Sequence, residues 1–274
     1  MANCNKCPSN EKCSRDKESC MIENNELNSV KKIIGVMSGK GGVGKSSICS
    51  LIAKALKRKG YSVGILDADI TGPSIPRLLG VKDKKVSYID ENILPVENHE
   101  GIKVMSLNLM TDNEEDPVIW RGPMISGLVK QFWTDVIWGD LDYLLIDMPP
   151  GTSDVALTVL QSIPIDGIVM VSIPQDLVSM IVSKAVNMAR KMDINILGVI
   201  ENMSYINCED CGKKIKLFSG ESTNKFLDEM NLKLLGELPM LNSISNLSEN
   251  KAEDENLKSI FDLISTIIID DLKQ

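Results

Sequence analysis

The sequence predicts an α/β domain built on a mostly parallel β-sheet with helices on both faces. From Lys31 onward, apolar runs of strand length alternate with longer segments of helical character, which is typical of parallel sheets. The apolar runs are continuous and rich in Val, Ile and Leu, as in strands that are covered on both faces. A chain of 274 residues is long enough to bury such a core.

The predicted elements alternate along most of the chain. Strands are predicted at residues 31–38, 62–69, 102–108, 143–150, 167–174, 195–202 and 232–239. Helices are predicted at residues 45–59, 123–138, 154–162, 176–191, 221–230 and 254–270. Residues 1–28 are polar and show no sustained period, so we expect a cysteine-rich tail there and one domain at residues 29–274. In such sheets, ligands bind at the carboxyl ends of the strands.

The acidic balance of the chain narrows the classes of function. Lys and Arg number 30 against 38 Asp and Glu, which gives a net charge of −8. Proteins that mainly bind nucleic-acid backbones are normally basic, so we expect no nucleic-acid partner. No apolar run approaches the ~20 residues of a membrane span, and the N-terminus lacks an apolar signal segment. We therefore expect a cytoplasmic protein with no membrane partner.

A glycine-rich segment, Gly39-Lys40-Gly41-Gly42-Val43-Gly44-Lys45-Ser46, follows the first predicted strand and opens the first predicted helix. It matches the phosphate-loop pattern G-x-x-x-x-G-K-[ST] in the required context. Glycines let backbone N–H groups turn toward an anion, and the helix directs its positive end to the same place. We expect Lys45 to reach the β- and γ-phosphates of a nucleotide and the Ser46 hydroxyl to bind Mg²⁺.

Lys40 is a second lysine inside this loop and marks the deviant Walker A pattern K-G-G-x-G-K-[ST]. The segment resembles the MinD/ParA/nitrogenase-iron-protein class of nucleotide-dependent dimers. The resemblance implies that Lys40 reaches across a homodimer to the nucleotide of the partner. It also implies that Asn202 reads adenine, and an amide that both donates and accepts suits a base edge. A plain turn residue is the alternative for Asn202.

Carboxylates follow the second and fourth predicted strands. Asp67 and Asp69 stand where carboxylates can hold Mg²⁺-bound water or orient an attacking water, and capping of the next turn is the alternative. Asp69 resembles the switch I aspartate of that class, so we expect it to position water, with Asp67 tied to the Mg²⁺ shell. Asp147 ends an apolar run in the Walker B form. The expected ATP-binding residues are Gly39, Lys40, Gly41, Gly42, Val43, Gly44, Lys45, Ser46, Ser47, Asp67, Asp147 and Asn202, and the expected catalytic residues are Lys40, Lys45 and Asp69.

Cys208 and Cys211 form a C-x-x-C pair shortly after Asn202. This spacing lets two thiolates converge on one metal ion or one edge of a cluster. Two cysteines are half of a tetrahedral site, which a twofold dimer could complete around a bridging [4Fe–4S] cluster. A zinc site that adds two cysteines of the tail is the rival, and spacing alone does not separate the two. A thioredoxin-like pair is disfavoured because the pair does not open a helix.

Further segments look like the Mrp/ApbC family of iron–sulfur cluster carriers. They are PVIWRGPM at 117–124, WGDLDY at 138–143, PGTSD at 150–154, PQD at 174–176 and ENMSY at 201–205. The resemblance implies a [4Fe–4S] cluster bridged between subunits by Cys208 and Cys211. It also implies ATP binding, slow hydrolysis and cluster transfer to apo iron–sulfur client proteins. A MinD/ParA-like positioning ATPase and a zinc-bound nucleotide-dependent scaffold are the alternatives.

The tail carries its own cysteines, Cys4, Cys7, Cys13 and Cys20. Four thiolates on one segment are enough for a second, intrachain cluster. Eukaryotic cytosolic relatives in this family carry a four-cysteine N-terminal cluster with a shared C-x2-C-x5-C core, although here the widest gap comes last. A reduced tail and a zinc-binding tail are the alternatives.

Two features are expected to serve packing. Cys49 lies on the helix after the phosphate loop, and we expect it to be a small, buried apolar side chain. The final helix has apolar residues at helical spacing, but its polar face is mostly acidic. Helices that lie on membranes need basic residues on that face, so we expect this one to pack against the domain.

Overall fold

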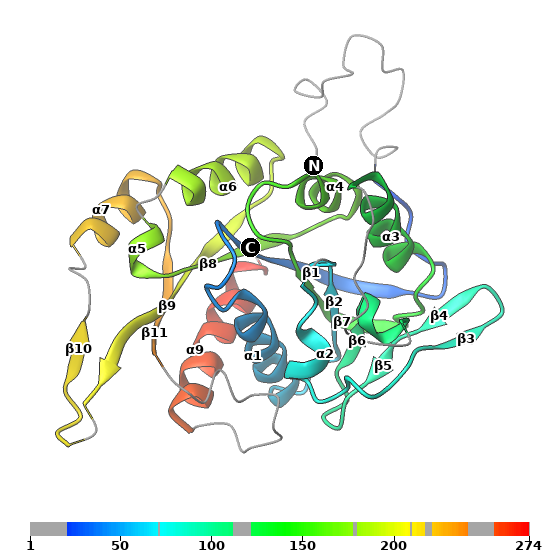
Figure 1. Cartoon of the computed structure of the whole chain (residues 1–274), viewed down its shortest axis with the longest axis horizontal. Coiled ribbons are helices and arrows are strands. Elements are labelled where there is room, and N and C mark those ends of the chain that lie inside the picture. The colour runs from blue at the N-terminus through cyan, green and yellow to red at the C-terminus, as the bar shows by residue number, and fades with distance from the viewer. Residues whose placement is uncertain are drawn as a thin grey trace, which may run out of the picture.

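Parallel pairing builds the centre of the sheet (Figure 1). The computed structural model of the chain describes residues 21–70, 72–111, 122–177, 180–208, 210–216, 221–240 and 255–273. Strand β1 (Ser29–Ser38) lies between β7 (Asp140–Asp147) and β8 (Gly167–Ser172) and runs parallel to both. Beyond β7 follow β2 (Val63–Asp67) and β6 (Lys103–Met105), again in parallel. The predicted parallel sheet is therefore confirmed.

On the other side of β8 the sheet continues with the long strand β9 (Ile196–Asn207), which is parallel to β8 and to β11 (Leu234–Pro239). The sheet ends in antiparallel strands, β5 (Val96–Glu97) at one edge and β10 (Lys214–Lys216) at the other. In Figure 1 the β9–β10 hairpin projects from the body of the molecule. Each of the seven predicted runs contains a parallel strand. Most of these strands are buried over most of their length, as their apolar sequences predict.

Helices cover both faces of the sheet. Helix α1 (Lys45–Arg58) packs on one face beside α9 (Glu255–Asp271), and Figure 1 shows the two helices side by side. The opposite face is covered by α3 (Gly122–Thr134), α4 (Asp154–Ser162) and α6 (Met180–Lys191). Helix α7 (Glu221–Glu229) contributes Phe226 and Leu227 to this second layer. Apolar residues at helical spacing give each helix one face to bury.

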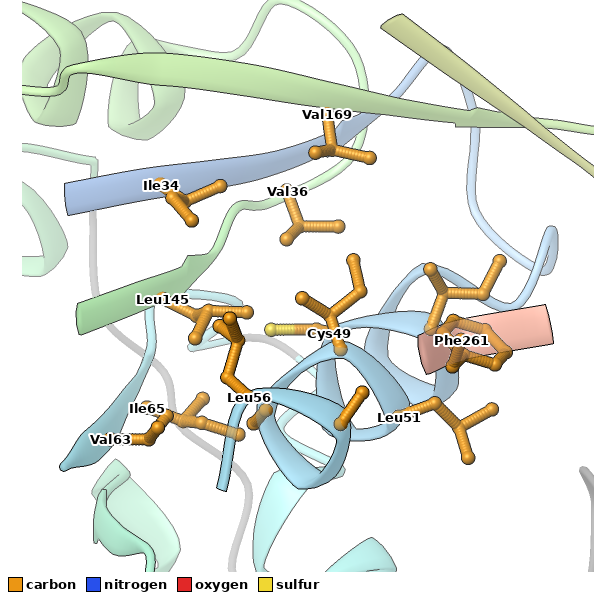
Figure 2. Close-up of a cluster of buried hydrophobic side chains, with 14 of the residues drawn as sticks. Ile34, Val36, Cys49, Leu51, Leu56, Val63, Ile65, Leu145, Val169 and Phe261 are labelled. Atoms are coloured by element: carbon orange, nitrogen blue, oxygen red, sulfur yellow. The ribbon is translucent and has the colours of Figure 1, made fainter. Parts of the chain in front are cut away.

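The core beneath α1 confirms two packing predictions. Cys49 is fully buried, and Figure 2 shows its sulfur among Ile34, Val36 and Leu145 of the sheet. Burial raises the pKa of the Cys49 thiol well above its ordinary value. Phe261 of α9 is buried in the same core, so the final helix packs against the domain as expected.

Some elements differ from the sequence prediction. The helical region predicted at 176–191 begins earlier, at Pro174, and comprises α5 (Pro174–Leu177) and α6. The helix predicted at 123–138 ends at Thr134. The sequence analysis also missed several short elements, which carry too few apolar residues to show a period. They are α2 (Ile75–Leu78), η4 (Leu107–Leu109), β5, β10 and the separate hairpin of β3 (Ser87–Ile89) and β4 (Asn92–Leu94).

Residues 21–28, the end of the predicted tail, contact the domain. The Ile22 N–H donates to the Ser162 carbonyl over 3.0 Å, and the indole N–H of Trp133 donates to the Ile22 carbonyl over 2.9 Å. The Asn28 side chain donates to the Val136 carbonyl over 2.8 Å. These bonds hold residues 22–28 against the domain. Cys4, Cys7, Cys13 and Cys20 lie outside the described residues.

Candidate functional site

The phosphate loop joins the end of β1 to the start of α1. Gly42 and Gly44 have φ values of 81° and 84°, a left-handed conformation that favours glycine. Helix α1 begins at Lys45, directly after Gly44, and no side chain caps it. Its first N–H groups therefore face the loop, and the helix directs its positive end there. This arrangement fits an anionic phosphate group.

Lys45, Ser46 and Asp147 form a buried polar cluster beside the loop. The Lys45 ammonium donates to Asp147 Oδ1 over 2.7 Å, and the Ser46 hydroxyl donates to Asp147 Oδ2 over 2.5 Å. Asp147 is fully buried at the end of β7, and the Lys45 side chain is 6% exposed. A hydroxyl next to a carboxylate is a pair of hard oxygen donors, which suits Mg²⁺. The structure thus brings together the predicted Walker A and Walker B residues.

Asp67 and Asp69 complete the charged cluster from β2. Asp67 is fully buried at the end of this strand, and its register partner on β7 is Asp147. Asp69 Oδ2 lies 3.7 Å from the Lys45 ammonium, and the Asp69 side chain is 15% exposed. Asp69 is therefore the carboxylate of this cluster with the most access to a bound substrate. Asp67 is held inside, where its carboxylate accepts from the Asp69 and Ile75 N–H groups.

Ser106 is a site residue that sequence reasoning missed. Its hydroxyl donates to Asp67 Oδ2 over 3.2 Å, and its side chain is fully buried just after β6. No local motif marks it, because a single serine has no pattern. Its position after a parallel strand that neighbours β2 was the available signal.

Burial sets the electrostatics of the cluster. It raises the pKa of Asp67 to about 8, and repulsion from Asp147 adds to that shift. Burial also raises the pKa of Asp147, against the attraction of Lys45. For Lys45, burial alone would lower the pKa, but the attraction of Asp147 outweighs it and the pKa is raised. Lys45 is thus a permanent cation that holds the carboxylates together.

Asn202 contacts the phosphate loop itself. Its side-chain amide donates to the Val43 carbonyl over 2.9 Å, although the side chain is fully buried on β9. Its Oδ1 atom is buried and has no hydrogen-bond partner among the described residues. A Cβ placed on Gly44 would lie 2.4 Å from the Asn202 Nδ2 atom. The role in adenine recognition that the sequence predicted stays a prediction, and the contact with the loop is new.

Lys40 lies inside the loop, and Ser47 directly follows it. The Lys40 side chain is exposed, and its backbone carbonyl accepts from the Ser38 hydroxyl over 2.9 Å. Ser47 is partly buried in the first turn of α1.

Cys208 and Cys211 lie at the tip of the β9–β10 hairpin. The Cys208 N–H donates to the Lys213 carbonyl, and the Gly212 N–H donates back to the Cys208 carbonyl over 2.9 Å. Gly212 turns the chain with a φ of 67°. Cys208 is half-buried, whereas Cys211 is exposed. The two thiols therefore occupy a tight turn at the surface.

The turn favours thiolate chemistry. The backbone N–H groups of Cys211 and Asp210 donate to the Cys208 sulfur, and these bonds lower the pKa of the Cys208 thiol. Within the described part of the chain, no group of three or more His, Cys, Asp or Glu side chains could hold a metal ion. The pair is therefore an incomplete ligand set by itself.

No helix in the described part of the chain is long and apolar enough to cross a membrane.

Comparison with known proteins places this site in a family. Residues 29–268 match the ParA family model described as NUBPL iron-transfer P-loop NTPase. The "Iron-sulfur cluster carrier protein" of Clostridium perfringens is 47% identical over 269 residues, covering 93% of this chain and 94% of the relative. The "Cytosolic Fe-S cluster assembly factor CFD1" of Candida albicans is 39% identical over 251 residues, covering 84% of this chain and 85% of the relative.

Solved structures agree with this assignment. A nucleotide-binding protein of Archaeoglobus fulgidus in complex with ADP is 38% identical with a TM-score of 0.68, covering 87% of this chain and 88% of that one. The cell division ATPase MinD of Pyrococcus furiosus matches with a TM-score of 0.61 at 21% identity, over 87% of this chain and 98% of that one. At this identity the match shows a shared fold. The chain belongs to the ParA family of NUBPL iron-transfer P-loop NTPases.

Proposed function

We propose that the protein is an ATP-dependent carrier that binds a [4Fe–4S] cluster and transfers it to apo-proteins. The observation that carries the proposal is the surface turn of Cys208 and Cys211, which directly follows β9, the strand that contacts the phosphate loop. The names of the relatives at 39–47% identity supply the class of cargo. A positioning ATPase of the MinD/ParA kind gives no reason for the cysteine pair.

The buried cluster beside the loop supports hydrolysis of ATP. Lys45 lies at the start of α1, where it can turn from Asp147 to the β- and γ-phosphates. Ser46 and Asp147 would hold Mg²⁺, with Asp67 behind them, and the ion would neutralise charge that develops on the phosphates. Asp69, the more accessible carboxylate, would orient the attacking water. Asn202 would accept from the adenine amine through its unpaired Oδ1 atom.

A homodimer would complete both sites. Two cysteines from each of two chains give the four thiolates that a [4Fe–4S] cluster requires. The exposed Lys40 would reach the nucleotide of the partner subunit. ATP binding and slow hydrolysis would then bias the dimer between two arrangements with different affinity for the cluster. We propose that this cycle runs in the reducing cytoplasm, where thiols stay available.

Anaerobic reconstitution of the full chain with ferrous iron and sulfide tests the proposal. We expect visible absorption from a cluster, and a loss of about four irons per dimer in the variant Cys208→Ala/Cys211→Ala. Comparing the two proteins isolates the cluster of this pair, even if Cys4, Cys7, Cys13 and Cys20 bind another. Cys49→Ala is the matched control, because it removes a cysteine that is buried in the core.

The outcomes separate the alternatives. Visible absorption and iron content that are unchanged by the loss of Cys208 and Cys211 contradict the bridging cluster. A colourless protein with stoichiometric zinc supports the scaffold instead. Transfer is measured as activity regained by the apo form of a [4Fe–4S] enzyme after incubation with the loaded carrier, and no regain with any nucleotide contradicts the carrier function.

A further inference from the structure

Strand β9 connects the nucleotide loop to the cysteine turn. Asn202, in the middle of the strand, donates to the Val43 carbonyl of the loop. The strand then runs to Asn207 and enters the turn at Cys208. The loop and the cysteines are therefore joined through a short segment of one strand.

This segment contains a β-bulge. Along β11 the register passes from Glu237 to Pro239, while along β9 it passes from Glu201 to Tyr205. The extra residues of β9 are accommodated by Met203, which has a φ of 54°. A left-handed conformation is uncommon for a residue with a side chain, and inside a strand it strains the backbone. The surrounding structure must hold the bulge in place.

Glu201 and Ser204 close the bulge from its two ends. The Ser204 hydroxyl donates to Glu201 Oε2 over 2.5 Å, and each side chain is 3% exposed. A hydrogen bond between a hydroxyl and a carboxylate is stronger than a neutral one, and more so when it is buried. Pairing resumes beyond the bulge, where the Met240 N–H donates to the Tyr205 carbonyl over 2.8 Å. The bond thus fixes the direction in which β9 leaves toward the hairpin.

We propose that Glu201 and Ser204 are positioning residues that hold this bulge and thereby couple nucleotide binding at the phosphate loop to the geometry of Cys208 and Cys211. The inference rests on the proposed function, because it links the ATP site to the residues that we propose bind the cluster. The coupling itself uses contacts within a single chain. When a nucleotide fixes the loop, the Val43 carbonyl fixes Asn202, and the closed bulge carries that constraint to the turn.

The coupling is reciprocal. If a nucleotide changes the free energy of the cysteine turn, a ligand on the cysteines changes nucleotide affinity by the same factor. The bond between Glu201 and Ser204 is the element that makes the two ends move together. Loss of this hydrogen bond lets the backbone at Met203 relax. The cysteine turn then no longer responds to a nucleotide bound at the loop.

Alkylation of the thiols by iodoacetamide measures this coupling in the full, cluster-free chain. Mass spectrometry of the digested protein gives the rate for Cys208 separately from the other cysteines. We expect a non-hydrolysable ATP analogue with Mg²⁺ to change the Cys208 rate about fivefold in the native chain. In Ser204→Ala the Cys208 rates with and without the analogue should differ by less than about twofold. Ser204→Thr, which keeps the hydroxyl, should restore the fivefold factor between the two rates.

Two further variants keep the test decisive. Ser265→Ala is the matched control, because Ser265 is fully buried and its hydroxyl donates to the Asp262 carbonyl within α9. It retains the fivefold factor. Met203→Gly removes the backbone strain, so it folds even if Ser204→Ala does not, and it weakens the factor because glycine leaves the bulge free.

The proposal is overturned if the nucleotide leaves the native Cys208 rate unchanged. It is also overturned if the factor stays about fivefold in Met203→Gly and in any folded Ser204→Ala protein. Because the measurement uses apo-protein, its outcome is independent of whether Cys208 and Cys211 bind a cluster. Failure of the carrier function appears in reconstitution with iron and sulfide, so the two failures are distinguishable.

Discussion

Asp67 and Asp147 are register partners at the carboxyl ends of two neighbouring parallel strands, and both are fully buried. Two carboxylates so placed repel each other, and burial penalises the charge on each of them. Lys45 lies against Asp147 and offsets this cost. The arrangement is costly for stability and is suited to holding a divalent cation beside a triphosphate.

Replacing Lys45 with alanine should therefore affect both stability and activity. We expect Lys45→Ala to abolish ATP hydrolysis, because it removes the ammonium that would reach the β- and γ-phosphates. It should also lower the free energy of unfolding by about 3 kcal/mol, since a buried carboxylate loses its partner. Phosphate release and urea unfolding measure the two effects. The double variant Lys45→Ala/Asp147→Asn should recover stability without activity, and a single variant that hydrolyses ATP normally contradicts the assignment of the loop.

Ser106 should affect ATP hydrolysis by positioning the Asp67 carboxylate. Ser106→Ala removes one of the donors to the Asp67 carboxylate, so kcat for ATP should fall about tenfold while KM changes little. Ser106→Thr, which keeps the hydroxyl, should recover most of kcat. Ser50→Ala is the matched control, because this buried hydroxyl has no hydrogen-bond partner among the described residues. Equal turnover in Ser106→Ala and Ser50→Ala shows that Ser106 does not position Asp67.

The succession of strands along the chain and the residues of the buried polar cluster could be predicted because each has a local signal. A continuous apolar run marks a strand covered on both faces, and the predicted residues Lys45, Asp67, Asp69 and Asp147 follow such runs. The structure brings these four residues into one cluster. The carboxyl-end rule for parallel sheets is what turns separate motifs into one site.

Contacts between distant segments gave no such signal. The Asn202 bond to Val43, the Ser106 bond to Asp67 and the Glu201–Ser204 bulge depend on register and on side-chain packing. Short polar elements such as β10 were missed for a related reason, because an exposed strand of three residues has no apolar period. A pattern of residues predicts elements well, whereas their register is a property of the assembled sheet.

Asp142 should make stability depend on pH. Bonds from Lys31 and from the N–H and hydroxyl of Ser62 lower its pKa from an ordinary value of 3.8 to about 2. A lowered pKa stabilises the fold at pH values above the pKa that Asp142 has in the unfolded chain. This contribution to stability disappears as the pH falls toward 2. Asp142→Asn should lose about 1–2 kcal/mol at pH 7, allowing for partial exposure. The urea midpoints of Asp142→Asn and the native chain should differ equally at pH 7 and 5, differ less at pH 3, and converge only near pH 2. The exposed Asp140→Asn should show no difference from the native chain at any of these pH values.

Gly44 should tolerate no side chain, for two reasons that can be separated. Its φ of 84° is unfavourable for alanine, and an added Cβ would lie 2.4 Å from the Asn202 amide that holds the loop. Gly44→Ala should therefore weaken ATP binding at least about tenfold, measured by calorimetry. Gly44→Ala/Asn202→Ala removes the collision but keeps the unfavourable φ, so it should recover stability without recovering affinity. Gly127→Ala in α3, where an added Cβ meets nothing, should leave ATP binding unchanged. If Gly44→Ala binds ATP as tightly as Gly127→Ala does, the contact between the loop and Asn202 does not shape the nucleotide site.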